Sequence, residues 1–223
     1  MDWLFGLSVG TLVYLAFAFD FFGFLARDEL WLRLLMLAAS ALYLIYYFVV
    51  VDEPLWDALI TNGVLAAVNL AMIFIVIIER TTFSMSHETA KLFKSFPMLS
   101  PGQFRRLIRS GERLEADKLT RLTEEGVVPE HLYFVINGPV DIEKNEDLIQ
   151  IPGGIFIGEL AFLSRTPATA SVFVDQGSHY LCWRHEDLDR LTRRSPAMNA
   201  AVVAQFNLDL AAKVSNSVPM GRI

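Results

Sequence analysis

Three long apolar stretches dominate the first third of the chain. They cover residues 3–26, interrupted only by Asp20, then residues 34–51 and residues 58–78, and the last two contain no charged residue. Because an α-helix rises about 1.5 Å per residue, a stretch of about 20 apolar residues crosses the hydrocarbon core of a bilayer. The pattern therefore predicts a transmembrane domain of three helices over residues 1–80, with the lipid bilayer as its partner.

Positive charges near the ends of these stretches predict the orientation of the chain. Arg27 and Arg33 lie in the predicted first loop, whereas the second loop, around Pro54, contains no basic residue. No basic residue precedes the first stretch, so we expect it to be retained and not cleaved as a signal peptide. Six basic residues follow the third stretch, namely Arg80, Lys91, Lys94, Arg105, Arg106 and Arg109. Since basic residues accumulate on the cytoplasmic side, we expect a multi-pass membrane protein with its N-terminus outside and its C-terminal domain in the cytoplasm.

One polar residue lies in the middle of the third stretch. Asn69 is flanked on both sides by apolar residues. A polar side chain in lipid is costly unless it has a partner, and a hydrogen bond between helices is worth about 1 kcal/mol. We expect Asn69 to have a packing role at a helix interface.

The pattern changes after residue 80, from continuous apolar runs to amphipathic helices and short strands. A linker helix is predicted within residues 81–99, and a folded domain over residues 100–214 is followed by a tail, residues 215–223. Ser100 and Gln103 are spaced as a capping box, with Pro101 at the first helical position, so a helix should begin there.

Turn signals divide the centre of this second domain into strands. Asn137-Gly138 and Pro152-Gly153-Gly154 separate short apolar segments in the manner of tight turns. Helical spacing returns at the end of the domain, with Ser195 as the N-cap of the last helix. The strands are predicted at residues 132–136, 140–142, 148–151, 170–174 and 179–183, and the helices at residues 186–193 and 196–214. The predicted fold class is α+β, with the transmembrane helices followed by a compact antiparallel β domain with flanking helices.

Composition and charge exclude several function classes. The chain is 53% hydrophobic with a net charge of −6, and neither half carries the excess of Lys and Arg that nucleic acid requires. Nucleic acid is therefore not an expected partner. Cys182 is the only cysteine, which excludes an internal disulfide and a cysteine-based zinc site. The chain lacks the sequence motifs of α/β-hydrolases, P-loop nucleotidases and zinc proteases, so we expect no catalysis, no metal and no cofactor.

The run from Ile157 to Leu163 is the most informative for chemistry. It predicts a strand end, a glycine at Gly158 and a short helix that begins at Glu159 with free backbone N–H groups. Such a helix start binds phosphate, and a carboxylate beside it accepts a hydrogen bond from a ribose hydroxyl. Phosphate and ribose together indicate a nucleotide.

At this run the sequence resembles the cyclic-nucleotide-binding domain family, which includes the catabolite activator protein, regulatory subunits of protein kinase A and cyclic-nucleotide-gated channels. The matching pieces are the Gly126 turn, residues 132–138, residues 158–163 and residues 167–172. Residues 167–172 lie in what the family calls its phosphate-binding cassette. The resemblance implies an eight-stranded cytosolic β-roll in which Gly158, Glu159, Leu160 and Ala161 line a ribose–phosphate site, with Thr169 in the same cassette and Ser171 at the family's Thr/Ser position. It also implies that the last helix closes over the base or forms a dimer seam.

One residue departs from the family pattern. The family has an arginine directly after the cassette proline, where this chain has Ala168, so the main countercharge to a cyclic phosphate is missing. Loss of one member of a buried charge pair costs about 2–5 kcal/mol. Arg165, three residues earlier in the same loop, either supplies a charge from another direction or is an exposed loop residue. The layout of three spans before a cytosolic β-roll also resembles the Popeye-domain membrane proteins, although their ligand motifs do not occur here.

These observations leave three functional hypotheses. The leading one is a membrane-anchored receptor for a cyclic mononucleotide that passes its signal to an oligomer or a partner. The second is a ligand-free scaffold with a degenerate pocket, which Ala168 favours, and the third is a ligand-triggered membrane effector. A homodimer is expected through the last helix, because Met198, Val202, Phe206 and Leu210 form an apolar face larger than a helix lying on a small roll needs.

Overall fold

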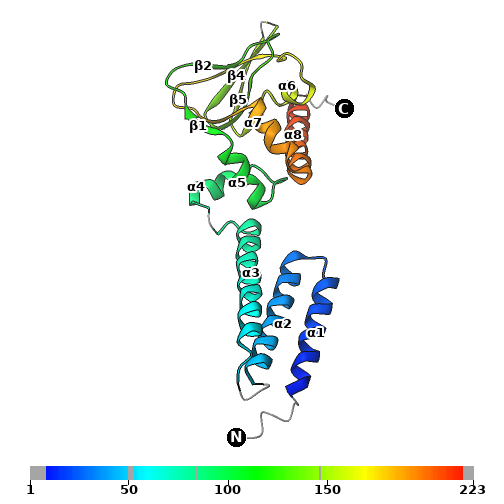
Figure 1. The fold of residues 1–223 in the computed structure, drawn as a ribbon. Helices are drawn as coiled ribbons and strands as arrows, with labels where there is room; N and C mark the ends of the chain where they lie inside the picture. The colour runs from blue at the N-terminus through cyan, green and yellow to red at the C-terminus, as the bar shows by residue number, and fades with distance from the viewer. Residues whose placement is uncertain (1–8, 50–52, 84, 146, 218–223) are drawn as a thin grey trace, which may run out of the picture. The chain divides into compact units, whose positions relative to one another are not determined.

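The chain folds into two compact units, Met1–Phe83 and Ser84–Ile223. A computed structural model describes residues 9–49, 53–83, 85–145 and 147–217 (Figure 1). Residues 3–8 of the first predicted span and most of the tail, residues 218–223, lie outside the described residues. We describe the two units separately.

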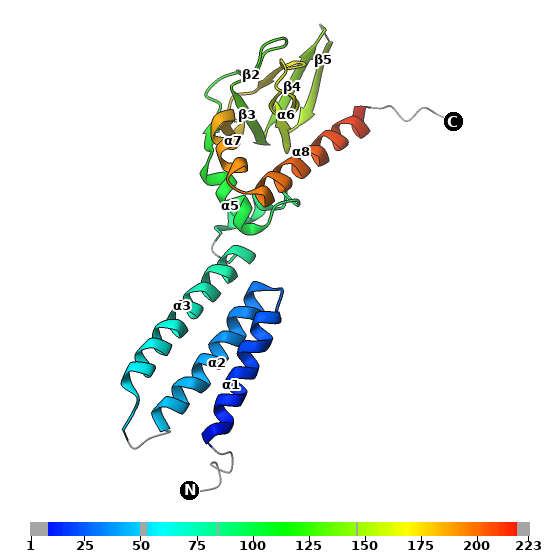
Figure 2. The ribbon, with the colours of Figure 1, turned by 45° about the vertical axis from the view of Figure 1, so that its right-hand side comes forward.

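The N-terminal unit consists of the helices α1 (Val9–Leu25), α2 (Glu29–Val49) and α3 (Trp56–Arg80). Helix α2 lies between the other two and packs against both (Figure 2). Helices α2 and α3 are long and apolar enough to cross a membrane, whereas α1, over its described residues, is shorter. The structure thus supplies two candidate spans where the sequence predicted three, and the Popeye-like layout depends on the third.

Helix α2 begins earlier than predicted. The side chain of Asp28 accepts hydrogen bonds from the backbone N–H groups of Leu30 (2.9 Å) and Trp31 (3.3 Å). An aspartate in this arrangement is a favourable N-cap. Arg33, which was predicted to lie in the first loop, is therefore part of the helix, and the loop keeps only Arg27.

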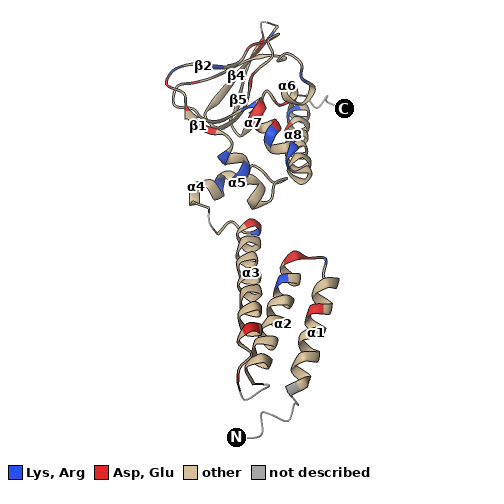
Figure 3. Ribbon diagram, in the orientation of Figure 1, with Lys and Arg blue, Asp and Glu red and all other residues tan. Residues whose placement is uncertain are grey.

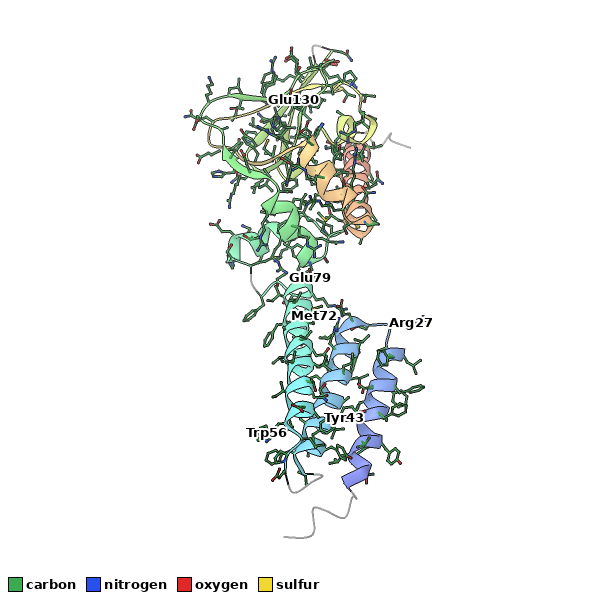
Figure 4. All side chains as sticks on the ribbon, viewed as in Figure 1. Arg27, Tyr43, Trp56, Met72, Glu79 and Glu130 are labelled. Carbon is green, nitrogen blue, oxygen red and sulfur yellow. The ribbon has the colours of Figure 1, made fainter. Side chains whose placement is uncertain are left out.

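The predicted packing role of Asn69 is confirmed. Its side chain is buried, and its Oδ1 accepts a hydrogen bond from Nη1 of Arg33 at 3.4 Å, which joins α3 to α2. The same two helices are tied near their ends by an ion pair between Arg80 and Asp28 at 2.7 Å. Figure 4 shows Arg27 and Glu79 at this end of the unit and Trp56 at the other.

Most large apolar side chains of this unit are exposed, and charged residues are few along α2 and α3 (Figure 3). Few side chains are buried between the helices, among them Ala16, Ala39, Ile73 and Val76. The outward-facing set includes Tyr14, Phe17, Phe24, Trp31, Ile45, Phe48, Trp56, Ile60, Val64, Leu65, Val68 and Phe74.

The C-terminal unit is built of eight short strands with helices before and after them. Its helices are α4 (His87–Phe93), α5 (Pro101–Arg109), α6 (Glu159–Ser164), α7 (His185–Arg193) and α8 (Pro196–Ser217). Its strands are β1 (Glu112–Glu115), β2 (Thr120–Thr123), β3 (His131–Asn137), β4 (Pro139–Lys144), β5 (Asp147–Pro152), β6 (Ile155–Ile157), β7 (Ser171–Val174) and β8 (His179–Arg184).

The strands form two four-stranded antiparallel sheets, in the orders β1-β8-β3-β6 and β2-β7-β4-β5. The predicted turns occur where expected, with Gly138 and Gly154 at φ +97° and +93°, a backbone conformation that glycine adopts without strain. Both predicted caps are confirmed: Ser100 and Gln103 form the capping box of α5, and Ser195 Oγ accepts from the backbone N–H of Met198 at 3.3 Å. The α+β class and the eight-stranded roll are as predicted.

The last helix packs inward. Met198, Val202 and Phe206 are each 1% exposed and belong to the same core cluster as Phe156 and Trp183. Met198, Val202 and Phe206 therefore cover the core of their own roll and leave no surplus apolar surface for a dimer, whereas Leu210 is half-buried and lines the cavity. The homodimer stays a prediction, but this apolar face no longer supports it.

Candidate functional site

A cavity of about 200 Å³ opens between the second sheet, the start of α6 and the last turns of α8. The structure brings six of the eight predicted site residues to it: Gly158, Glu159, Leu160, Ala161, Ala168 and Thr169. The remaining lining residues are Thr123, Ile142, Ile157, Ala170, Val172, Leu210 and Lys213. A single cavity thus gathers segments separated by up to 90 positions in the sequence, from Thr123 to Lys213.

Gly158 shapes the corner from which Glu159 enters the cavity. Its φ of +88° lies in the left-handed region, and a Cβ there would also meet the backbone oxygen of His131 at 3.4 Å. The carbonyl of Gly158 accepts from the backbone N–H of Phe162 at 2.9 Å, which starts α6. The glycine therefore lets the chain turn from β6 into α6 and directs Glu159 inward.

The loop that carries Ala168 is held against the cavity by backbone hydrogen bonds. Ala168 donates to the carbonyl of Val127 and accepts from the N–H of Gly126, both at 2.9 Å. Ala168 is 8% exposed and is one of the residues that line the cavity. The position of the family arginine thus faces the cavity but offers no charge.

Arg165 and Ser171 do not line the cavity. Arg165 forms an ion pair with Asp189 at 2.5 Å and lies over the ring of Phe162 at 4.8 Å, so its guanidinium is occupied at the surface. Ser171 Oγ accepts from the backbone N–H of Glu125 at 3.0 Å. Of the two interpretations open for Arg165, the structure agrees with the exposed loop residue.

Glu159 is the buried charge of the site, with 4% of its surface exposed. Burial raises the pKa of its carboxyl group, and the neighbouring ammonium of Lys213 opposes that rise. Nζ of Lys213 lies 2.6 Å from Oε1 of Glu159 and 2.8 Å from Oδ2 of Asp209. Lys213 also donates to the carbonyl of Phe156 at 2.5 Å.

Sequence reasoning missed Lys213 and Asp209. They are the only charged residues of α8, and their spacing of four places them on one face of the helix. An isolated acid–base pair on an otherwise uncharged helix is a signal that could have found them. Their approach to Glu159, however, depends on the path of α8.

The described residues include no candidate metal cluster, and their one cysteine is a weak nucleophile. Among them, no group of three His, Cys, Asp or Glu residues is placed to hold a metal ion. Burial raises the pKa of the Cys182 thiol to about 11, so little of it is the reactive thiolate near neutral pH.

Comparison with known proteins identifies the class of this unit. Residues 113–195 match the family model described as "Cyclic nucleotide-binding domain". The fold is similar to a cyclic nucleotide-binding domain from Methylobacillus flagellatus KT, with 18% identity, 60% of this chain and 83% of that chain covered, and a TM-score of 0.51. The catabolite activator protein of Thermus thermophilus matches with 20% identity, 56% and 60% coverage and a TM-score of 0.45. No curated protein sequence is significantly similar to this chain.

The C-terminal unit therefore contains a segment, residues 113–195, that matches the cyclic nucleotide-binding domain family, and its strands form two antiparallel sheets. The match covers less than half of the chain and does not include the N-terminal helices.

Proposed function

We propose that the protein is a membrane-anchored sensor that binds a cyclic mononucleotide in the cavity of its cytoplasmic β-roll. The observation that carries the proposal is the buried carboxylate of Glu159 in a cavity within a cyclic nucleotide-binding domain. A buried carboxylate accepts a hydrogen bond from a ribose hydroxyl, which is the donor that such a ligand brings.

The ligand test uses the full chain in mild detergent with cyclic AMP and cyclic GMP, and with cyclic dinucleotides for comparison. A ligand at 100 times its Kd stabilises the folded state by about 2.7 kcal/mol, which a shift in melting temperature detects. Because Ala168 supplies no countercharge, the titration extends to millimolar ligand. Glu159→Ala should abolish the shift, whereas Arg165→Ala, outside the cavity, should keep it. No shift with any of these ligands for a folded parent protein would refute the proposal.

Membrane anchoring is supported by the two long apolar helices and by the exposure of their large side chains. The orientation is inferred from the basic residues that follow α3 and from the lack of Lys and Arg in the predicted loop around Pro54, before α3. Single cysteines in a Cys182→Ser background test this part of the proposal. An impermeant maleimide should label position 53 from outside intact cells and position 130 only after the cells are opened. Labelling in the opposite order would overturn the cytoplasmic placement.

A ligand-free assembly domain is the second candidate function. It is favoured by the contact between Glu159 and Lys213, which already occupies Oε1 of the carboxylate, and by the size of the cavity. Ligand pockets usually measure about 300–1,000 Å³, more than the cavity seen here. The two candidates differ in whether the cavity opens to admit a ligand.

A further inference from the structure

The charged groups beside the cavity form a closed cluster. Glu159 is on α6, and Asp209 and Lys213 are on α8. The ammonium nitrogen of Lys213 lies 2.6 Å from Oε1 of Glu159 and 2.8 Å from Oδ2 of Asp209. Two carboxylates and one ammonium give the cluster a formal charge of −1. In the part of the chain that the structure describes, Lys213 is the one cation that lines the cavity.

The ammonium of Lys213 is engaged mainly by the protein itself. It donates hydrogen bonds to Oε1 of Glu159 at 2.6 Å and to the carbonyl of Phe156 at 2.5 Å. Oδ2 of Asp209 lies 2.8 Å from it as an ion-pair partner but accepts no hydrogen bond. The lysine therefore holds Oε1, one of the two carboxylate oxygens of Glu159. A ribose hydroxyl that uses Oε1 must displace Lys213 from it.

The same contacts fasten the last turns of α8 to the roll. Lys213 bonds to Glu159 on α6 and to the carbonyl of Phe156 on β6, and the backbone N–H of Phe156 donates to Asp209 at 3.3 Å. The apolar anchors of α8, which end with Phe206, lie nearer its start, while Val214 beyond them is 62% exposed. Breaking the lysine contacts therefore loosens the end of the helix, where the bond from Phe156 to Asp209 remains, and leaves its beginning packed.

We propose that Lys213 is a built-in competitor for the ribose subsite, so that a ligand binds by taking Glu159 from it and thereby releases the last turns of α8. This inference rests on the proposed function and adds the means by which occupancy of the cavity changes the rest of the protein. Asp209, four residues away on the same helix, remains a partner for the displaced ammonium.

The binding test uses the full chain in detergent, with Ala168→Arg as the background and cyclic AMP as the probe. In this background the phosphate has a countercharge of its own. Asp209→Asn combined with Lys213→Met removes one charge of each sign, so the cluster keeps its formal charge of −1. The pair of changes should tighten cyclic AMP binding by about tenfold, equivalent to about 1.4 kcal/mol. Asp209→Asn alone leaves Lys213 bound to Glu159 and should not tighten cyclic AMP binding.

Unchanged or weaker binding by the double variant would overturn the competitor role. Failure of the Ala168→Arg background itself to bind would instead count against the proposed function, so the two failures are distinguishable. If the double variant does not fold, hydrogen exchange of the Ala168→Arg protein tests the competitor role instead. Saturating cyclic AMP should speed exchange of the amides of residues 210–215, and slower exchange there would overturn the proposal.

Discussion

The C-terminal unit buries its large apolar side chains against one another, whereas the N-terminal helices point theirs outward. Trp183 and Phe156 are each 1% exposed, while Trp56 is 65% and Phe24 is 74% exposed. Leaving such surface in water costs about 25 cal/mol for each Å². The difference teaches that the roll supplies its own apolar environment, whereas the helices leave large apolar side chains exposed, as the proposed membrane anchor requires.

The largest expected effect comes from truncating the core of the roll. Trp183→Ala should cost about 3–5 kcal/mol of folding free energy, because it leaves a cavity. It also removes the hydrogen bond from its indole nitrogen to the carbonyl of Leu107 at 2.8 Å. Chemical denaturation followed by circular dichroism of the β structure measures the loss. Trp56→Ala should leave the unfolding transition of the roll unchanged. An equal loss of folding free energy in the two variants would contradict the difference between the two units.

A charge on the outward face of α3 tests the other side of the comparison. Val68, 52% exposed near the middle of α3, should face lipid. Val68→Arg should therefore oppose membrane integration by about 2.5–3.5 kcal/mol, measured as the alkali-resistant fraction in microsomes. Leu148→Arg is the matched control, because Leu148 is 68% exposed on β5 of the roll. Equal integration of the two variants would mean that α3 does not lie in lipid.

A smaller effect concerns the side chains that accept hydrogen bonds from the free backbone N–H groups at helix starts. Ser100 caps α5 with its side chain, whereas Leu55 at the start of α3 makes no side-chain cap. Ser100→Ala should lower the stability of the C-terminal unit by about 1 kcal/mol, and Ser100→Asp, which keeps an acceptor, should preserve it. A denaturation midpoint that is the same for all three proteins would show that the cap contributes nothing.

Much of the roll could be predicted because its strands are bounded by glycine turns and its helices by capping residues. Strand β1 was not predicted individually, since its residues are all exposed and Glu-Arg-Leu-Glu shows no apolar alternation. The burial of α8 could not be foreseen either. An apolar stripe at helical spacing has the same pattern whether it covers its own core or a partner.

The candidate site was predictable only in part. Gly158 and Glu159 are neighbours in one motif, so their joint position followed from local sequence. Lys213 is 54 positions from Glu159, and only the packing of α8 brings the two together. Arg165 lies within the cassette but turns to Asp189 on α7, a contact that local sequence does not specify.

Calorimetric titration of cyclic AMP into the parent chain and into Ala168→Arg tests the central claim most directly. Ala168 lines the cavity, so an arginine at this position should place its charge beside a phosphate bound near Glu159. We predict binding to the variant at least about tenfold tighter than to the parent, with no gain for adenosine, which lacks the phosphate. Binding of cyclic AMP by a folded Ala168→Arg protein that is no better than the parent's would contradict the account.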